Sequence, residues 1–156
     1  FTGVYKLAAI ERSGRLEATM KFSDNPEKST NPGVKQAYRL YGDDGLALAD
    51  LIALEDEAAP ASGADLEIYH PSADWRRIRV RPAAVRSLLS PVMEGGRIAA
   101  SLPSLGDARG RLAGEIGRFD STYLRILNPH IYKVSISEKL RDLKLRFIKK
   151  YMKEGK

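Results

Sequence analysis

The sequence has no cysteine, only two histidines and no long uninterrupted run of hydrophobic residues. The lack of cysteine excludes disulfide bonds, thiolate metal sites and cysteine nucleophiles. A domain without covalent cross-links also suits a reducing compartment, and we therefore expect a cytoplasmic protein. A membrane-spanning helix needs about 20 consecutive apolar residues. Because no such run is present, we expect no transmembrane segment and no membrane partner.

Short catalytic and nucleotide-binding motifs are also missing. The sequence contains no Walker-type phosphate loop, no glycine fingerprint for a dinucleotide and no His-Glu-x-x-His zinc motif. The two histidines, His70 and His130, each stand beside a proline and lack the convergent partners of a metal site or a nucleophile-base pair. We predict a structural or surface role for both, and no metal site.

Positive charge is in excess. The chain has 26 lysines and arginines against 20 acidic residues, for a net charge of +6, and its pI is about 9.6. This balance favours an anionic partner. Because the charges are spread along the whole chain, phosphorylated small molecules and nucleic acid both remain open.

Apolar residues at every second position predict a β-rich first half. The expected strands are 4–10, 16–22, 34–41, 46–54, 66–70 and 75–81. The first is almost continuously apolar and is expected to be buried on both faces. The sequence enters this strand without a cap or turn, which suggests a piece of something longer. A tight turn at 42–45 favours a meander of antiparallel hairpins, and 55–64 is expected to be an exposed connector.

The period of the apolar residues changes to that of a helix after Pro82. One helix is expected from Pro82 to Met93, ended by Gly95 and Gly96. A second is expected from a capping box at Ser104 up to residues 128–129, and a third from a cap at Ser135, with Ile136 on its apolar face. These patterns predict an α+β fold, with a β-rich portion at 1–82 and a helical portion at 83–156, packed as one unit.

Four cations surround the predicted loop between the second and third strands. Lys21, Lys28, Lys35 and Arg39 lie within nineteen residues of one another. Strand alternation places Lys35 and Arg39 on one face of the third strand, whereas Lys21 is expected to point away from the apolar face. Lysines on a loop can surround phosphate groups as point charges, so these residues are candidates for phosphate or pyrophosphate binding. A solvated basic loop is the alternative.

A second basic feature is the strand at 75–81, where Arg77 and Arg79 share a face with Trp75 and Arg81. Such a strand can track a nucleic-acid backbone while the indole stacks on a base. The plainer interpretation is an edge strand whose charges prevent sheets from aggregating. No helix-turn-helix or RNP-type pattern supports nucleic acid as a partner.

Five motifs of the sequence, in the same order, resemble those of nicotinate phosphoribosyltransferases. They cover essentially the whole chain, which corresponds to about the carboxyl-terminal third of a family member. The motifs are Gly3-Val-Tyr-Lys-Leu7, Met20-Lys-Phe-Ser23 with Asn25-Pro-Glu-Lys28, Pro32-Gly-Val-Lys-Gln-Ala-Tyr-Arg39, Leu102-Pro-Ser-Leu105, and Tyr123-Leu-Arg-Ile-Leu-Asn-Pro-His-Ile-Tyr-Lys-Val-Ser-Ile-Ser-Glu-Lys-Leu140.

This resemblance implies ATP-assisted transfer of a phosphoribosyl group from phosphoribosyl pyrophosphate to nicotinate, in NAD synthesis by pyridine salvage. It implies a carboxyl-terminal segment of a type II phosphoribosyltransferase with an α/β barrel, often a homodimer, using ATP and Mg²⁺ at sites mostly upstream of this segment. Neither histidine matches the family's phosphorylated histidine. Lys21 and Lys28 fall where related enzymes place basic residues near the phosphates.

No catalytic residue is expected within this segment. Because both substrates are held by the barrel upstream, we expect the isolated segment to be inactive. Two other classes of function stay open at this point. One is a stand-alone basic module that binds nucleic acid, and the other is a structural or dimerisation domain.

Overall fold

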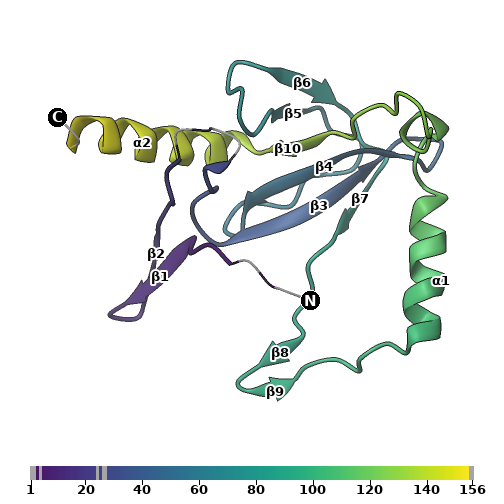
Figure 1. The fold of residues 1–156 in the computed structure, drawn as a ribbon, viewed down its shortest axis with the longest axis horizontal. Helices are drawn as coiled ribbons and strands as arrows, with labels where there is room; N and C mark the ends of the chain where they lie inside the picture. The colour runs from purple at the N-terminus through teal and green to yellow at the C-terminus, as the bar shows by residue number, and fades with distance from the viewer. Residues whose placement is uncertain (1–2, 4, 24, 26–27, 155–156) are drawn as a thin grey trace.

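The computed structural model describes residues 3, 5–23, 25 and 28–154. The described part of the chain forms short strands and two α-helices, both of which lie in the second half (Figure 1). The elements in chain order are β1 (Ala9–Arg12), β2 (Arg15–Ala18), β3 (Lys35–Tyr41), β4 (Ala47–Leu54), β5 (Leu66–Tyr69), β6 (Arg77–Val80), β7 (Ala84–Ser87), β8 (Met93–Glu94), β9 (Arg97–Ile98), α1 (Leu105–Ile116), the 3₁₀ helix η2 (Ser121–Tyr123), β10 (Val134–Ile136) and α2 (Glu138–Glu154).

The centre of the molecule is a six-stranded sheet in the order β6-β5-β10-β4-β3-β7. Its two edge strands, β6 and β7, are joined by residues 81–83 alone. In a flat sheet these edges would lie roughly 24 Å apart, whereas the link from Val80 to Ala84 can span at most roughly 14 Å. The sheet must therefore curl until its two edges come close together.

Curling encloses one face of the sheet as the main core. The buried side chains of that face come from β3, β4 and β5, and Val80 and Val85 from the two edge strands pack against them. The enclosed residues are Tyr38, Leu40, Ala49, Leu51, Ala53 and Ile68. They occupy alternate positions along each strand, as expected where only one face of a strand is buried.

The outer face of the sheet carries α2. Leu140, which is fully buried, joins Ile136 of β10 and Tyr69 of β5 in a second core cluster, against which Ile52 and Leu54 of β4 pack. The helix follows directly after β10, which runs parallel to β4 and antiparallel to β5. The three-residue strand thus fixes where α2 crosses the sheet.

Several predictions for the first half are confirmed. The hairpin of β3 and β4 pairs Lys35 with Leu54 and turns at Gly42–Gly45, where Gly45 has a φ of +75°. β5 pairs with β6, which is an edge strand. The connector at 55–64 contains no helix or strand. A β1–β2 hairpin forms at the turn containing Gly14, whose φ is +74°.

Two predictions about strand and helix type are wrong. The stretch from Pro82 to Met93 is not a helix, because residues 84–87 form β7 against β3 and Val85 packs on the enclosed core. Met93 begins the β8–β9 hairpin, which turns at Gly95 and Gly96. The first strand begins at Ala9 and is not buried on both faces, since Leu7 is 61% exposed. Val4 lies outside the described residues.

The remaining helices are shorter than the sequence pattern predicts. α1 has the predicted capping box of Ser104 and Asp107 but ends at Ile116. α2 is capped by Ser137, whose Oγ accepts the N–H of Leu140 at 3.2 Å, and not by Ser135. Ser135 and Ile136 lie in β10, so the predicted helical portion at 83–156 also supplies β7 and β10 to the central sheet.

None of the helices in the described part of the chain is long and apolar enough to cross a membrane.

Candidate functional site

The loop between β2 and β3, which carries the predicted phosphate site, is closed at both ends on one carbonyl group. The N–H groups of Thr19 and Gly33 both donate to the carbonyl oxygen of Ala8, at 2.9 and 2.7 Å. Within the loop, Thr30 Oγ1 accepts the N–H of Lys21 at 2.8 Å, and the N–H of Thr30 donates to the Lys21 carbonyl at 3.2 Å. Pro26, which is also in this loop, lies outside the described residues.

The end of the loop requires glycine at position 33. Gly33 has a φ of +84°, where side chains are strained. A Cβ atom there would also come within 2.9 Å of Leu54 Cδ2. Pro32, just before it, is fully buried. The turn that leads into β3 is therefore fixed by packing as well as by hydrogen bonds.

An aromatic contact anchors the start of the loop to α2. The ring of Phe22 stacks on Tyr151 with 4.2 Å between centroids and 16° between planes. Met20 is buried, whereas Lys21 between them is exposed, as strand alternation predicts. This part of the loop is thus held by its apolar side chains while Lys21 stays accessible.

Lys21 and Lys28 are both exposed and are therefore available to an anion. Lys6 Nζ donates to the carbonyl oxygen of Lys28 at 3.2 Å, which brings a third ammonium group to the loop. This contact is not predictable from the sequence pattern, because the two residues are 22 positions apart. The binding of phosphate by Lys21 and Lys28 stays a prediction.

Lys35, by contrast, is directed back at its own loop. Its Nζ donates to the carbonyl oxygens of Asn31, at 2.9 Å, and of Gly33. Burial lowers the pKa of Lys35 from its ordinary value. Its ammonium group is engaged in holding the turn, so it has fewer donors left for a ligand than Lys21 or Lys28. The predicted phosphate contact of Lys35 stays untested.

Arg39 is held by carboxylates on the outer face of the sheet. Its Nε and Nη2 donate to the two oxygens of Asp50 at 2.8 and 2.9 Å, and its Nη1 donates to Glu115 Oε2 at 2.9 Å. The side chain is only 14% exposed. The hydrogen bonds to Asp50 raise the pKa of Arg39 despite its burial. Phosphate binding by Arg39, also untested, would require an anion to compete with two carboxylates.

The same cluster joins the second half of the chain to the sheet. Tyr132 donates to Asp50 Oδ1 at 3.0 Å, and burial raises the pKa of its hydroxyl. Arg86 Nη2 donates to Glu115 at 2.6 Å, and this bond is the main reason why the pKa of Glu115 lies below its ordinary value. The guanidinium of Arg39 also lies over the Phe119 ring, 4.9 Å from its centroid. The cluster therefore has a structural role.

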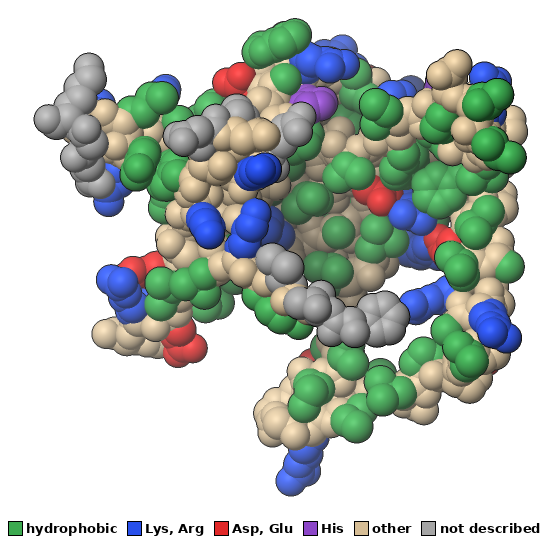
Figure 2. All heavy atoms as spheres, in the orientation of Figure 1, with side chains coloured by type: hydrophobic (Ala, Val, Ile, Leu, Met, Phe, Trp, Pro, Cys, Tyr) green, Lys and Arg blue, Asp and Glu red, His purple; other side chains and the backbone are tan. Residues whose placement is uncertain are grey.

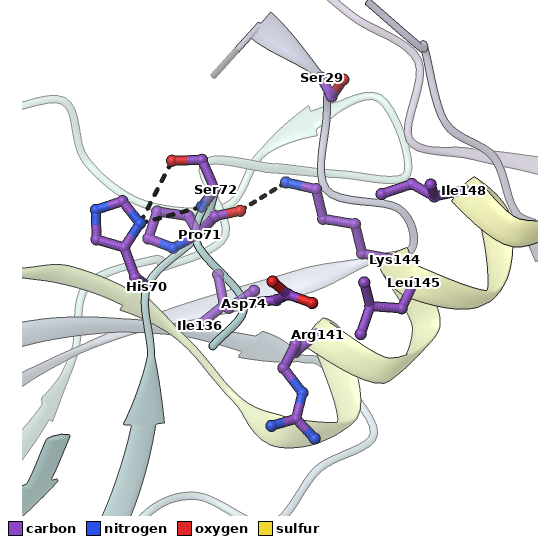
Figure 3. Close-up of a pocket in the computed structure, with 10 residues that line it drawn as sticks. All are labelled: Ser29, His70, Pro71, Ser72, Asp74, Ile136, Arg141, Lys144, Leu145 and Ile148. Atoms are coloured by element: carbon purple, nitrogen blue, oxygen red, sulfur yellow. Dashed lines mark hydrogen bonds between the residues drawn. The ribbon is translucent and has the colours of Figure 1, made fainter. Parts of the chain in front are cut away.

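A hollow of about 200 Å³ lies beside the loop, between α2 and the turn after β5 (Figure 3). Lys144 reaches across it from α2 and donates to the Pro71 carbonyl at 2.7 Å. Ser29 of the loop lines the opposite wall, and Figure 3 shows the guanidinium of Arg141 pointing away from the ammonium of Lys144. Burial lowers the pKa of Lys144. The lining is mostly apolar, so the hollow is not an evident polar catalytic centre.

His70 has the structural role that the sequence predicts. Its Nδ1 accepts the backbone N–H groups of Ser72 and Ala73 at 3.2 and 3.1 Å, so the ring proton is on Nε2. The side chain thereby closes the turn between β5 and β6. His130 is exposed and lies near Tyr123, with ring centroids 6.4 Å apart.

The arginine strand is partly engaged within the protein. Arg77 Nη1 donates to Glu67 at 3.3 Å, and Arg81 Nε donates to the Gly63 carbonyl at 2.7 Å. Trp75 is 78% exposed but precedes β6. These contacts suit the interpretation of β6 as a charged edge strand better than that of a nucleic-acid surface.

The residues that the structure describes do not fit a metal site. No group of three or more histidine, cysteine, aspartate or glutamate side chains among them is placed to hold a metal ion. The binding sites of the Mg²⁺ and ATP that the sequence resemblance implies stay a prediction.

Comparison with known proteins matches this fold and sequence to one family. The family described as "Nicotinate phosphoribosyltransferase C-terminal domain" matches residues 34–144, which begin just after the loop that carries Lys21 and Lys28. The Homo sapiens nicotinate phosphoribosyltransferase is 38% identical over 141 residues, covering 90% of this chain and 25% of the human protein. The Bos taurus enzyme of the same name is 37% identical over 140 residues, with the same coverage of each chain.

A solved structure, titled "Crystal structure of human Nicotinic Acid Phosphoribosyltransferase", superposes with a TM-score of 0.70 at 33% identity. The match covers 76% of this chain and 24% of the human one. The chain thus spans about a quarter of the length of the relatives it matches, rather than the expected third. It belongs to the nicotinate phosphoribosyltransferase family, within which it corresponds to the carboxyl-terminal domain.

Proposed function

We propose that this domain works in an enzyme that transfers a phosphoribosyl group from phosphoribosyl pyrophosphate to nicotinate with the help of ATP. The products are nicotinate mononucleotide and pyrophosphate, and the pathway is NAD synthesis from the preformed base. The observation that carries this proposal is the family match over residues 34–144. We further propose a cytoplasmic homodimer, in which Mg²⁺ and ATP bind upstream of this domain.

Within that enzyme, we propose that the loop of Lys21 and Lys28 contacts the phosphates of phosphoribosyl pyrophosphate. Two features support this role. The loop is closed on Ala8, and Phe22 anchors the residue next to Lys21 to α2, so the backbone that carries Lys21 is held in place. Release of pyrophosphate develops negative charge on the leaving group, and fixed cations stabilise that charge more as the bond breaks. In a homodimer the loop can serve the site of its own subunit or that of its neighbour.

Changing Lys21 or Lys28 to alanine in a family-length enzyme is expected to raise the Michaelis constant for phosphoribosyl pyrophosphate, to lower turnover, or both. A hydrogen bond to a charged group contributes about 1.5–3 kcal/mol, so we expect a loss of roughly tenfold or more in kcat/KM. Steady-state kinetics at varied phosphoribosyl pyrophosphate measures it. Lys139→Ala, at an exposed position on α2, is the matched control and should behave as the unchanged enzyme. If both loop variants also do so, the loop is a structural turn.

The 156-residue chain by itself is expected to form no nicotinate mononucleotide. The chain spans about a quarter of the length of its relatives, and we propose that both substrates bind mainly in the part of the enzyme that it does not contain. Product formation from nicotinate, phosphoribosyl pyrophosphate and ATP, followed by chromatography, checks this against a reaction without protein. Product above that control would place the active site within this domain.

A further inference from the structure

One long segment of the domain exposes apolar side chains to an unusual extent. We call residues 89–131 the apolar arm. They include more than half of the exposed large apolar side chains in the described part of the chain. In Figure 1 the arm leaves the sheet after β7, passes through the β8–β9 hairpin and α1, and returns to the sheet. Large contiguous apolar patches on soluble proteins usually mark sites of interaction.

The β8–β9 hairpin of the arm has almost no packing of its own. It has only two residues in each strand, and its cross-strand pair Met93 and Ile98 is 64% and 63% exposed. An isolated two-stranded hairpin is at best marginally stable in water. Figure 2 shows hydrophobic side chains gathered over the β8–β9 hairpin.

Helix α1 is also unsupported along its length. None of its 12 residues is buried, and three glycines at positions 106, 110 and 114 lower its intrinsic stability. Leu105, Leu112 and Ile116 share one face and are 70%, 61% and 45% exposed. A helix of this length needs packing on such a face to be stable. Its contact with the sheet is at its carboxyl end, through Glu115.

The segment after η2 completes the surface. Ile126, Leu127 and Ile131 are 97%, 81% and 92% exposed, so nearly the whole of each side chain is in contact with solvent. They lie on the stretch that leads from α1 to β10. Strand, helix and loop residues of the arm therefore all contribute exposed apolar side chains.

We propose that the apolar arm docks on the part of a family-length chain that precedes this domain. The relatives are about four times as long as their matched region, and that region is the carboxyl-terminal domain, so most of their length precedes it. A covalently attached partner has an effective concentration of the order of millimolar. It therefore outcompetes a second copy at ordinary concentrations unless the contact between copies is much tighter.

Amide hydrogen exchange tests the proposal without reference to enzymatic activity. Exchange of residues 89–131 is compared between the 156-residue chain and a family-length chain that contains it. We expect roughly tenfold slower exchange or more in the longer chain, because docking suppresses local opening of the arm. The double variant Ile126→Asp with Leu127→Asp should restore fast exchange in the longer chain and leave the melting temperature of the short chain unchanged.

The matched control is the double variant Ile126→Leu with Leu127→Ile, which keeps the surface apolar and should keep the protection. Equal exchange of the arm in both chain lengths would overturn the proposal. So would slow exchange in the short chain that appears only as protein concentration rises, together with a dimer in sedimentation, because the occupant would then be a second copy. If the family-length chain forms no nicotinate mononucleotide but amide exchange of its arm is still slow, the result counts against the proposed reaction and not against the docking.

Discussion

Replacing Arg39 with methionine is expected to lower the free energy of unfolding by about 3 kcal/mol, because removal of one partner leaves buried charges without compensation. Arg39 and Asp50 are 14% and 16% exposed, and Glu115 is 24% exposed. The substitution keeps most of the side-chain volume but removes three hydrogen bonds, from two carboxylates that stay in place. Urea unfolding of the 156-residue chain measures the change.

Two variants separate this charge effect from general disruption. Arg86→Met removes a guanidinium that is 43% exposed and should cost clearly less. Arg39→Met combined with Asp50→Asn should recover part of the loss, since the uncompensated charge at position 50 is gone. A change of less than about 1 kcal/mol in the single Arg39 variant would place it among ordinary surface pairs and would contradict the structural role of the cluster.

Glu115 gives the same cluster a dependence on pH. Its bond with Arg86 holds its pKa below the ordinary value in the folded state, whereas in the unfolded chain the value is about 4.3. Glu115 therefore contributes to stability at pH values above its pKa in the unfolded chain. This contribution is lost as the pH falls through its pKa in the folded protein. The Arg86→Met variant should lose less stability than the parent over that acidic range.

Replacing Leu140 with alanine is the second change with a large expected effect, a loss of about 2–5 kcal/mol. Leu140 is fully buried between Tyr69 and Ile136, where α2 meets the outer face of the sheet. The smaller side chain leaves a cavity that the two strands cannot readily close, because the parallel pairing of β10 with β4 fixes their positions. The midpoint of urea unfolding should fall while its slope stays unchanged.

The matched control for Leu140 is Leu127→Ala, the same chemical change at a side chain that is 81% exposed. In the isolated chain it should alter the free energy of unfolding by no more than about 0.5 kcal/mol. If both variants unfold at the same urea concentration as the parent, α2 contributes little to the core, and the second hydrophobic cluster is not a stabilising contact.

Local patterns in the sequence were sufficient to predict the β3–β4 hairpin and the capping box of α1. In the hairpin, Tyr38 and Leu40 lie on the enclosed face on either side of the charged Arg39, and the partner strand lies directly after a tight turn. The capping box needs only Ser104 and Asp107, three residues apart. Both features are decided by residues that are close together along the chain.

The failures concern elements whose partners are distant in sequence. Val85 has the spacing of a helical residue, but β7 pairs with β3 more than forty residues earlier and packs against the enclosed core. The spacing of apolar residues predicts Ile136 on the face of the last helix, but Ile136 lies in β10 between β4 and β5. A three-residue strand inserted into the middle of a sheet has too short a pattern to be recognised in the sequence.

In the candidate site, too, local features are predictable from the sequence, whereas the partners of side chains that are distant in sequence are not. Lys21 is exposed, as alternation along the second predicted strand leads one to expect, although β2 itself ends at Ala18. Alternation also placed Lys35 and Arg39 on one face of β3, but it had no means of showing that Lys35 turns back to the Gly33 carbonyl or that Glu115, 76 residues away, binds Arg39. The partner of a charged side chain depends on the tertiary fold, and the pattern of one strand does not contain it.

The most direct test of the proposed role is a crystal structure of a family-length enzyme that contains this domain, with phosphoribosyl pyrophosphate bound. We predict that Nζ of Lys21 or Lys28 lies about 3 Å from a phosphate oxygen, in its own subunit or in a neighbouring one. If both ammonium groups lie beyond hydrogen-bond reach of every phosphate oxygen in the assembly, the loop does not bind the substrate and the account of this site is wrong.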